Sequence, residues 1–195
     1  MSTKTILVAL GILCFALRGP SQTSSISSAP GKLVVSSDQF SAVQQLLDDQ
    51  AKQGYSVSTI SYHSSFKDLY RKGRLEIGLK VTDVQGKREY RFLTTELEAF
   101  VLARELSENG AKGFRLLRPT PIPLELGLVR TRDMFIAIME RPRDSRDEYT
   151  YRVVAYRRLP AARDNIKQTL ADGFTEVCRH QFGPVVYLVM EKVTN

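Results

Sequence analysis

The chain has 195 residues, of which 43% are hydrophobic and 25% are charged, and its formal net charge is +7. This composition predicts a folded protein with a hydrophobic core and excludes global disorder. The positive charge is compatible with an anionic surface as partner, but it falls far short of a nucleic-acid-binding signature.

The first 22 residues are typical of a secretory signal peptide. Lys4 supplies the positive start, and an apolar run from Ile6 to Leu17 follows. That run is shorter than the roughly 20 residues that a membrane-spanning helix needs, so an uncleaved anchor is the lesser alternative. We expect a secreted or periplasmic protein with no transmembrane span after the signal is removed. Residues 23–31, rich in Ser, Pro and Gly, are expected to form a flexible tether.

One cysteine, Cys178, remains after removal of the leader, so no intramolecular disulfide is expected. The protein must therefore fold in an oxidising compartment without covalent cross-links. We expect Cys178 to be a small buried side chain, with a reactive or intermolecular thiol as the alternative.

A glycine followed by an aromatic residue occurs three times in the chain, each time after an amphipathic run and before a predicted strand. The pairs are Gly54 and Tyr55, Gly113 and Phe114, and Gly173 and Phe174. A glycine just past a helix adopts the left-handed backbone conformation that other residues resist. These six residues are therefore predicted to be structural helix stops, and their near-equal spacing predicts an internal repeat.

The first predicted repeat covers residues 32–86. A short strand at 33–35 precedes a helix, for which Ser36 and Gln39 form a capping box. The helix buries apolar residues at helical spacing, namely Phe40, Val43, Leu47 and Ala51. Strands follow at 55–63 and 75–81. The second of these alternates, with Leu75, Ile77, Leu79 and Val81 on one face.

The second predicted repeat covers residues 87–143, at an offset of 59 from the first. This offset maps the capping box onto Thr95 and Glu98, and it maps Ile77 and Leu79 onto Ile136 and Ile138. Strands are predicted at 88–93 and 134–139. Alternating prolines at 119–123 indicate either protection of a sheet edge, which we favour, or presentation of a ligand.

The third predicted repeat covers residues 148–193. It has a strand at 149–156, a helix that buries Ala162, Ile166 and Leu170, and a hairpin of 174–180 with 185–190. The strands at 134–139 and 185–190 are apolar throughout, which predicts burial of both their faces. We expect the second and third repeats to pack together, with the first more peripheral. The predicted fold is α+β, with three tandem βαββ repeats, each a helix on one face of a largely antiparallel sheet.

Residues 149–192 resemble a small uncharacterised bacterial domain family that has two spaced tyrosines, a Val-Val pair, a helix, a glycine-aromatic stop and a strand ending in a basic residue. The matching residues are Tyr149, Tyr151, Val153, Val154, Gly173, Phe174, Tyr187, Glu191 and Lys192. Phe174 departs from the family's usual Trp. The resemblance implies a βαββ fold and no known activity.

No catalytic, cofactor-binding or metal-binding residues are assigned from the sequence. His63 and His180 lack the spacing of a metal site, and no nucleophile elbow or glycine-rich phosphate loop is present. His180 with Cys178 is too weak a pair to assign as catalytic. Acidic pairs such as Asp48 and Asp49 are expected to be solvated helix surface.

A basic and aromatic loop in the first repeat is the candidate binding site. Its residues are Phe66, Lys67, Tyr70, Arg71, Lys72 and Arg74. Exposed loops of this kind bind anionic groups or protein partners. The sequence therefore predicts a non-enzymatic interaction or structural module of a bacterial envelope. The alternative is a protein that binds an anionic ligand or surface through this loop. A third, enzymatic reading requires a polar pocket between repeats.

Overall fold

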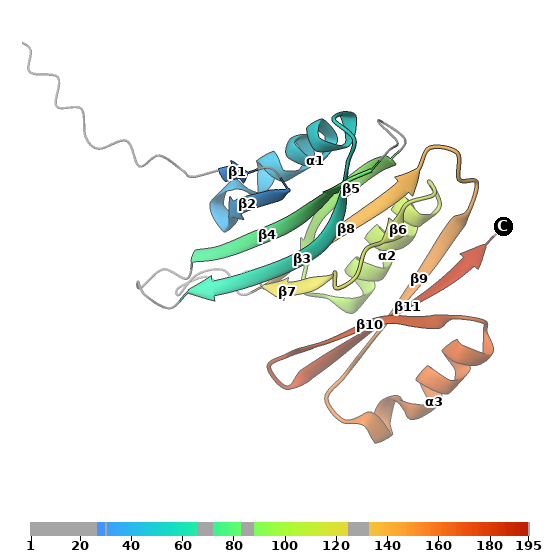
Figure 1. Ribbon diagram of the computed structural model, residues 1–195. Coiled ribbons are helices and arrows are strands. Elements are labelled where there is room, and N and C mark those ends of the chain that lie inside the picture. Colours follow the sequence, from blue (N-terminus) through green and yellow to red (C-terminus); the bar gives the residue numbers. More distant parts are fainter. Residues whose placement is uncertain (1–26, 30, 66–71, 83–87, 125–132, 195) are drawn as a thin grey trace, which may run out of the picture.

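The computed structural model describes residues 27–29, 31–65, 72–82, 88–124 and 133–194 (Figure 1). Within these ranges the protein is a mixed α+β structure, and all strand pairs in its three sheets are antiparallel. The chain forms three successive units, each with its own sheet.

The elements of the first unit are β1 (Ser27–Ala29), β2 (Lys32–Ser36), the 3-10 helix η1 (Ser37–Ala42), α1 (Val43–Lys52), β3 (Tyr55–Ser65) and β4 (Lys72–Val81). Those of the second unit are β5 (Arg88–Glu96), α2 (Ala99–Gly110), β6 (Arg115–Leu116), β7 (Ile122–Leu124) and β8 (Met134–Pro142). Those of the third unit are β9 (Glu148–Tyr156), α3 (Leu159–Ala171), β10 (Thr175–Phe182) and β11 (Val185–Thr194).

The three sheets share one strand order. The last strand of each unit lies between the first strand and the strand that follows the helix, as in β2-β4-β3, β5-β8-β6 and β9-β11-β10. Residues 135–139 of the central strand β8 are buried on both faces, whereas the central strand β4 alternates between buried and more exposed residues. Part of the expected tether, Ser27–Ala29, forms β1, which pairs with the outer edge of β2.

The three helix-ending glycines have positive φ angles of 85°, 85° and 88°, at Gly54, Gly113 and Gly173. The aromatic residues after the second and third glycines, Phe114 and Phe174, are buried. The glycine geometry thus turns each chain from helix into strand and directs the next side chain into the core.

A basic residue of the last strand secures the second and third of these turns. Arg141 donates to the carbonyl of Lys112 at 2.7 Å, and its guanidinium lies 4.8 Å from the ring centre of Phe114. Lys192 donates to the carbonyl of Asp172 at 2.8 Å and lies over the ring of Phe174. Each cation therefore satisfies a helix-terminal carbonyl and packs on the adjacent aromatic ring.

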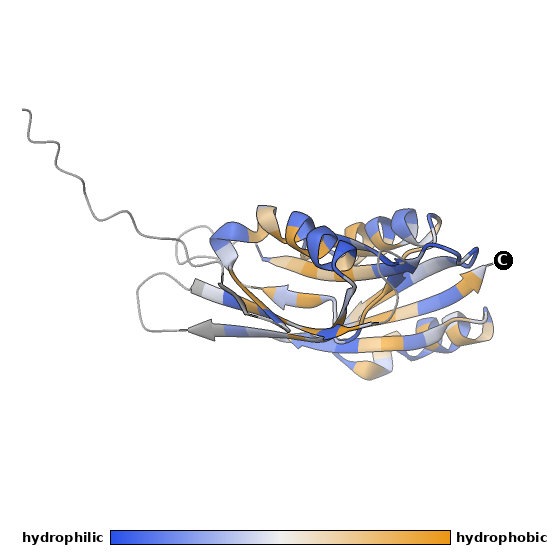
Figure 2. Cartoon of the chain, turned by 45° about the horizontal axis from the view of Figure 1, so that its top comes forward, coloured by the Kyte–Doolittle hydropathy of each residue, from blue (hydrophilic) through white to orange (hydrophobic). Residues whose placement is uncertain are grey.

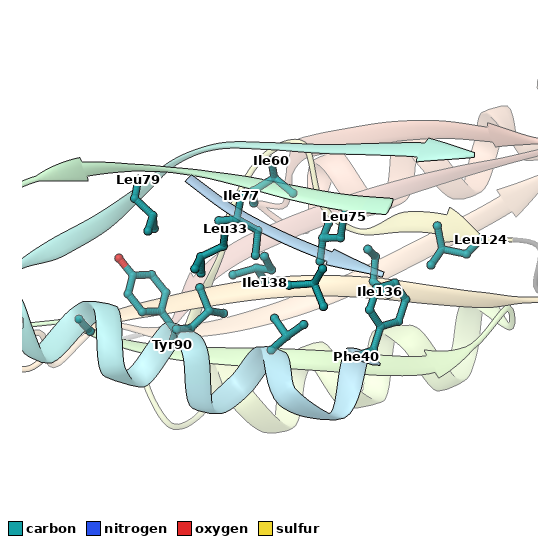
Figure 3. Close-up of a cluster of buried hydrophobic side chains, with 14 residues drawn as sticks. Leu33, Phe40, Ile60, Leu75, Ile77, Leu79, Tyr90, Leu124, Ile136 and Ile138 are labelled. Atoms are coloured by element: carbon teal, nitrogen blue, oxygen red, sulfur yellow. The ribbon is translucent and has the colours of Figure 1, made fainter. Parts of the chain in front are cut away.

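Three hydrophobic clusters join the units in sequence order. The first holds α1, one face of the first sheet and Tyr90, Ile136 and Ile138 of the second sheet (Figure 3). The second joins the opposite face of β8 to α2 and to one face of the third sheet. The third lies between α3 and the remaining face of the third sheet. In Figure 2, hydrophobic and hydrophilic residues alternate along strands and helices, as this layered packing requires.

The layered packing corrects the expectation that the first unit is peripheral. The second unit is central, because residues 135–139 of β8 are fully buried and alternate between the first and second clusters. The first and third units each contact it on one face.

The predicted offset of 59 residues between the first two repeats is wrong by one residue at the last strand of each unit. In each unit, the residue three positions after the helix-ending glycine pairs with a residue of the last strand. The pairs are Val57 with Leu79, Leu116 with Met139, and Glu176 with Met190. Leu79 therefore corresponds to Met139 and not to Ile138. Because side chains alternate, a shift of one places Ile138 on the opposite face, toward the first unit.

Both predicted capping boxes are wrong. Ser36 makes no side-chain bond to the helix, because the chain first forms η1, and the Gln39 side-chain oxygen is buried without a partner among the described residues. Thr95 lies in β5, where it pairs with Phe135, so the second helix begins later and after Glu98.

Two predicted core positions are also wrong. Val81 is 74% exposed at the end of β4, and Leu170 is 49% exposed. The buried face of α3 instead contains Thr169, whose hydroxyl donates to the Asn165 carbonyl at 2.8 Å. A residue seven positions after Ala162 stays on the same helix face, whereas one eight positions after it turns outward.

Candidate functional site

The helix of each of the first two units covers the free edge of the next unit's first strand. Gln44 of α1 donates to the carbonyl of Tyr90 at 3.0 Å and accepts from the amide of Phe92 at 2.8 Å. One carboxamide thus satisfies two backbone groups on the outer edge of β5. An edge protected in this way is unavailable for pairing with another strand.

The edge of β9 is covered by α2 in the same manner, but only in its first half. The hydroxyl of Ser107 accepts from the amide of Tyr151 at 3.0 Å and donates to its carbonyl at 3.2 Å. Gly110 lies against the backbone of Tyr149, where an added Cβ would come within 2.1 Å of the carbonyl oxygen. The close approach of helix and strand requires glycine at this position.

A tyrosine at each junction binds the backbone of the preceding unit. The hydroxyl of Tyr90 accepts from the amide of Val57 at 3.1 Å, and that of Tyr151 accepts from the amide of Leu116 at 2.9 Å. Both amides belong to the residue three positions after the helix-ending glycine. The two junctions therefore use one geometry.

The second junction contains a buried acid. Glu191, 3% exposed, accepts from the Tyr151 hydroxyl at 2.9 Å and from Arg115 at 3.0 and 2.9 Å. Burial, and then the charge of Glu191, raise the pKa of Tyr151 well above its usual range. The hydrogen bond to Glu191 raises the pKa of Arg115. Tyr151 and Arg115 therefore both keep their protons near neutral pH, and the network acts as a structural link between units.

The second half of β9 has a free edge. The amide and carbonyl of Tyr151 both bind Ser107 and therefore point away from β11. Tyr151 and Glu191 of β11 thus lie opposite each other as a pair without backbone hydrogen bonds between them. In an antiparallel pair such positions alternate, so Val153 and Ala155 also direct their amide and carbonyl away from β11. No described residue forms a hydrogen bond to these four groups. They are the open donors and acceptors of an edge strand.

The free edge lies in a groove between two helices. One cavity, of about 360 Å³, is lined by Ala99, Phe100 and Ala103 of α2, by Asn165 and Thr169 of α3, and by residues 151–154. A neighbouring cavity, of about 580 Å³, is lined by residues 154–158 and by Ala161, Ala162 and Asn165. Val154 and Asn165 border both cavities, so the two are continuous along β9.

The helix walls of this groove include four alanines, Ala99 and Ala103 of α2 and Ala161 and Ala162 of α3, together with the polar residues Asn165 and Thr169 of α3. One large aromatic side chain, that of Phe100, projects beside it. Phe100 is 75% exposed although it lies in the first turn of α2. An exposed aromatic side chain beside open backbone groups is a common feature of protein-binding surfaces. We call the edge and its walls, residues 151–158 with the lining residues of α2 and α3, the β9 groove.

The side chains of the preceding helix explain why this part of β9 stays open. Gln44 of α1 lies ten residues before Gly54, and the residue ten positions before Gly113 is Ala103 of α2. Ala103 lines the groove beside Val153 but has no hydrogen-bonding side chain. The carboxamide that binds the edge of β5 therefore has no counterpart beside Val153.

Comparisons with protein-family models, with curated proteins and with solved structures gave no match.

Most of the basic and aromatic loop predicted as a binding site lies outside the described residues. Phe66, Lys67, Tyr70 and Arg71 are in this part, and for Lys72 only the strand position in β4 is described. Arg74 is described, and its Nε lies 3.7 Å from a carboxylate oxygen of Glu76. The loop stays a prediction.

Cys178 and His180 both contact the proline-rich segment of the second unit. The Cys178 thiol lies 3.2 Å from the Thr120 carbonyl, and His180 Nε2 lies 2.7 Å from the Pro119 carbonyl. Burial raises the pKa of Cys178 to about 12 and lowers the pKa of His180. A protonated thiol and a neutral imidazole that each face a carbonyl form a packing contact between units.

Among the residues that the structure describes, no group of three or more His, Cys, Asp or Glu side chains is placed to hold a metal ion. No helix in the same residues is long and apolar enough to span a membrane.

Sequence reasoning missed the β9 groove. In the sequence, Val153 and Val154 indicate a strand and contribute to the family resemblance, and Phe100 carries no functional prediction. The available signal was an alanine, Ala103, at the position that Gln44 occupies in the first unit, together with an aromatic residue on the polar side of an amphipathic helix.

Proposed function

We propose that this protein is a non-enzymatic interaction module of a bacterial envelope, secreted or periplasmic, that binds an extended segment of another protein by strand addition to β9. The observation that carries this proposal is the pair of open backbone positions, Val153 and Ala155, in a groove walled by two helices. Strand addition at an exposed edge gains affinity from backbone hydrogen bonds and specificity from neighbouring pockets.

Other open edges are less suited to this role. β3 is also an edge strand, but it carries Ser58, Thr59, Ser61 and His63 as exposed side chains, and its pairing is interrupted between Val57 and Thr59. Polar side chains and a bulge are devices that protect an edge from pairing.

We also propose that the three units are copies of one βαββ module, in keeping with the family resemblance of residues 149–192. The shared strand order and the repeated tyrosine junction support this. The alternative function, binding of an anionic surface by the loop around residues 66–74, depends on side chains that are mostly not described.

The test uses nine-residue random peptides displayed on phage, selected on the full chain and then synthesised. We expect selected peptides to slow hydrogen exchange at the amides of Val153 and Ala155, measured by NMR. Ala155→Pro removes an outward amide without touching the β11 ladder, and an edge strand tolerates proline at such a position. This variant is expected to lose at least about tenfold in affinity, because one backbone hydrogen bond and the close approach of the partner are lost.

Ala155→Val is the matched control, since it changes the side chain and keeps the amide. Its affinity is expected to stay within about threefold of the wild type, as for a surface substitution away from special features. Peptides that bind Ala155→Pro as tightly as wild type, or that leave both amides unprotected, would show that β9 is not the binding edge.

A further inference from the structure

We infer that the strand which adds to β9 runs antiparallel to it and carries acidic residues at its amino-terminal end, next to Arg157 and Arg158. This inference rests on the proposed function and specifies the chemistry of the partner. It follows from three features of the β9 groove, namely the length of the open edge, the charge at one end and the side chains on its two sides.

The open edge is short, which favours an antiparallel partner. An antiparallel residue directly opposite Val153 or Ala155 exchanges both hydrogen bonds with it, so a three-residue span satisfies all four open groups. A parallel partner forms slanted bonds to residues on either side and must extend further along the strand. Extension is blocked toward Tyr151, where Ser107 already occupies the edge.

Positive charge collects at the other end of the open edge. Arg157 and Arg158 line the larger cavity, and no acidic residue lines either cavity. Neither arginine has an ion-pair partner among the described residues, although Arg157 also borders a separate cavity with Glu96, Glu98 and Asp133. The first turn of α3, which begins here, has no acidic residue, so its amino-terminal dipole adds to the positive potential.

Antiparallel pairing places the first residues of the partner at this positive end. Residues opposite 157 are then acidic, and those opposite 155, 154 and 153 follow toward the α2 end. The partner side chains opposite 155 and 153 face the same side of the sheet as Ala155 and Val153. Phe100 and Ala103 of α2 line that end of the groove. The partner side chain opposite 154 faces the other side, toward Ala162 of α3. The partner is therefore an acidic residue pair followed by small apolar residues.

The same charge argues against a second copy of this chain as the occupant. Two β9 edges that pair antiparallel around residue 154 place Arg157 of each copy opposite residue 151 of the other, next to Arg152 and beside a cavity that no acidic residue lines. Like charges at an interface suppress association and favour a partner of opposite sign.

The inference is tested with three acetylated and amidated peptides, Glu-Glu-Val-Val-Val-Ser, Gln-Gln-Val-Val-Val-Ser and the reversed Ser-Val-Val-Val-Glu-Glu. Affinity is measured by fluorescence polarisation of labelled peptide, and the site by exchange protection of the Val153 and Ala155 amides. We expect the first peptide to bind at least about tenfold more tightly than the other two. The ratio of the affinity of the Glu-Glu peptide to that of the Gln-Gln peptide should fall by at least about threefold in the single variant Arg158→Gln. It should fall further in the double variant that combines Arg157→Gln and Arg158→Gln. Arg163→Gln, which removes an exposed α3 charge outside the cavity linings, is the matched control and should keep the full advantage.

The outcomes separate this inference from the proposed function. If all three peptides protect Val153 and Ala155 with equal affinity, strand addition holds and the acidic, antiparallel partner is overturned. Tighter binding of the reversed peptide overturns the direction alone. If no peptide protects either amide, both proposals fail. Protection of the two amides without peptide, together with dimerisation in sedimentation experiments, identifies a second copy as the occupant and overturns the inference.

Discussion

At the scale of single residues, Tyr151 connects more parts of the molecule than any neighbour described above. Its backbone binds Ser107 of α2, and its hydroxyl joins the amide of Leu116 to the carboxylate of Glu191. Removal of the hydroxyl leaves a buried amide and a buried carboxylate each short of one partner. Such unsatisfied groups cost more than the net contribution of the bonds themselves.

We therefore predict that Tyr151→Phe lowers the free energy of unfolding by about 1–3 kcal/mol. The measurement is urea denaturation followed by far-UV circular dichroism at pH 7. Tyr149→Phe is the control, because the Tyr149 hydroxyl makes only a long contact of 3.4 Å to Asp147. That change should cost less than about 0.5 kcal/mol. Equal effects of the two substitutions would mean that the hydroxyl of Tyr151 has no special role in the junction.

At the scale of elements, the fit of α2 to β9 depends on Gly110, the last residue of the helix. Alanine in place of glycine in a helix interior normally stabilises by roughly 0.5–1 kcal/mol. At Gly110 the added Cβ would meet the carbonyl oxygen of Tyr149 at 2.1 Å, and this atom belongs to the backbone and cannot rotate away. The steric effect opposes helix propensity and is the larger of the two.

Gly110→Ala is accordingly predicted to destabilise the protein, by about 1–3 kcal/mol, the usual cost of forcing a group into a packed site. It should also speed hydrogen exchange at the Tyr151 amide, because α2 must move away from β9 and weaken the Ser107 bonds. Gly183→Ala is a comparison without the steric contact: nothing lies within 4 Å of the added atom, and its cost comes only from the positive φ angle of 54° at Gly183. A more stable Gly110→Ala variant would contradict the close helix-to-strand contact.

The elements were largely predictable from the sequence, while their junctions were not. Apolar spacing identified the buried face of α1, and the continuous apolar runs of β8 and β11 indicated burial on both faces. The helix starts were misjudged because a capping box is a local pattern, and strand pairing of Thr95 with Phe135 overrode it. Gln44 and Ser107 read as ordinary polar helix residues, since nothing local marks a side chain that binds a distant strand edge.

At the scale of the whole molecule, the third unit ends the stack with a polar face. Ile60 and Tyr62 of β3 lie opposite Ile77 and Leu75 and face the next unit. The corresponding residues of β10 are Arg179 and Gln181, opposite Leu188 and Val186. In a stack of repeats, the arrangement that we propose for this chain, such a polar face offers little apolar surface for packing of a further unit.

The central sheet makes the three units one cooperative structure. We predict that Ile138→Ala, in the strand shared by the first two clusters, lowers the free energy of unfolding by about 2–5 kcal/mol. In native-state hydrogen exchange, the protection of the most slowly exchanging amides should decrease by the same amount in all three units. Loss of protection in the first unit alone would show that the units unfold independently. Ala162→Gly, in the third cluster, provides a comparison confined to α3.

The first strands of the second and third units are each covered by the helix that precedes them in the chain. This order matters because the chain is synthesised, and we propose exported, from its amino terminus. When β5 emerges, α1 with Gln44 has already been synthesised, and when β9 emerges, α2 with Ser107 has been synthesised. Among the described residues no helix precedes β2, and β1 is made before it. Each new edge therefore meets its cover as it appears, so nascent chains crowded together have little opportunity to pair with one another. Along the second half of β9 no described residue provides such a cover, and this is the same feature that leaves room for a partner.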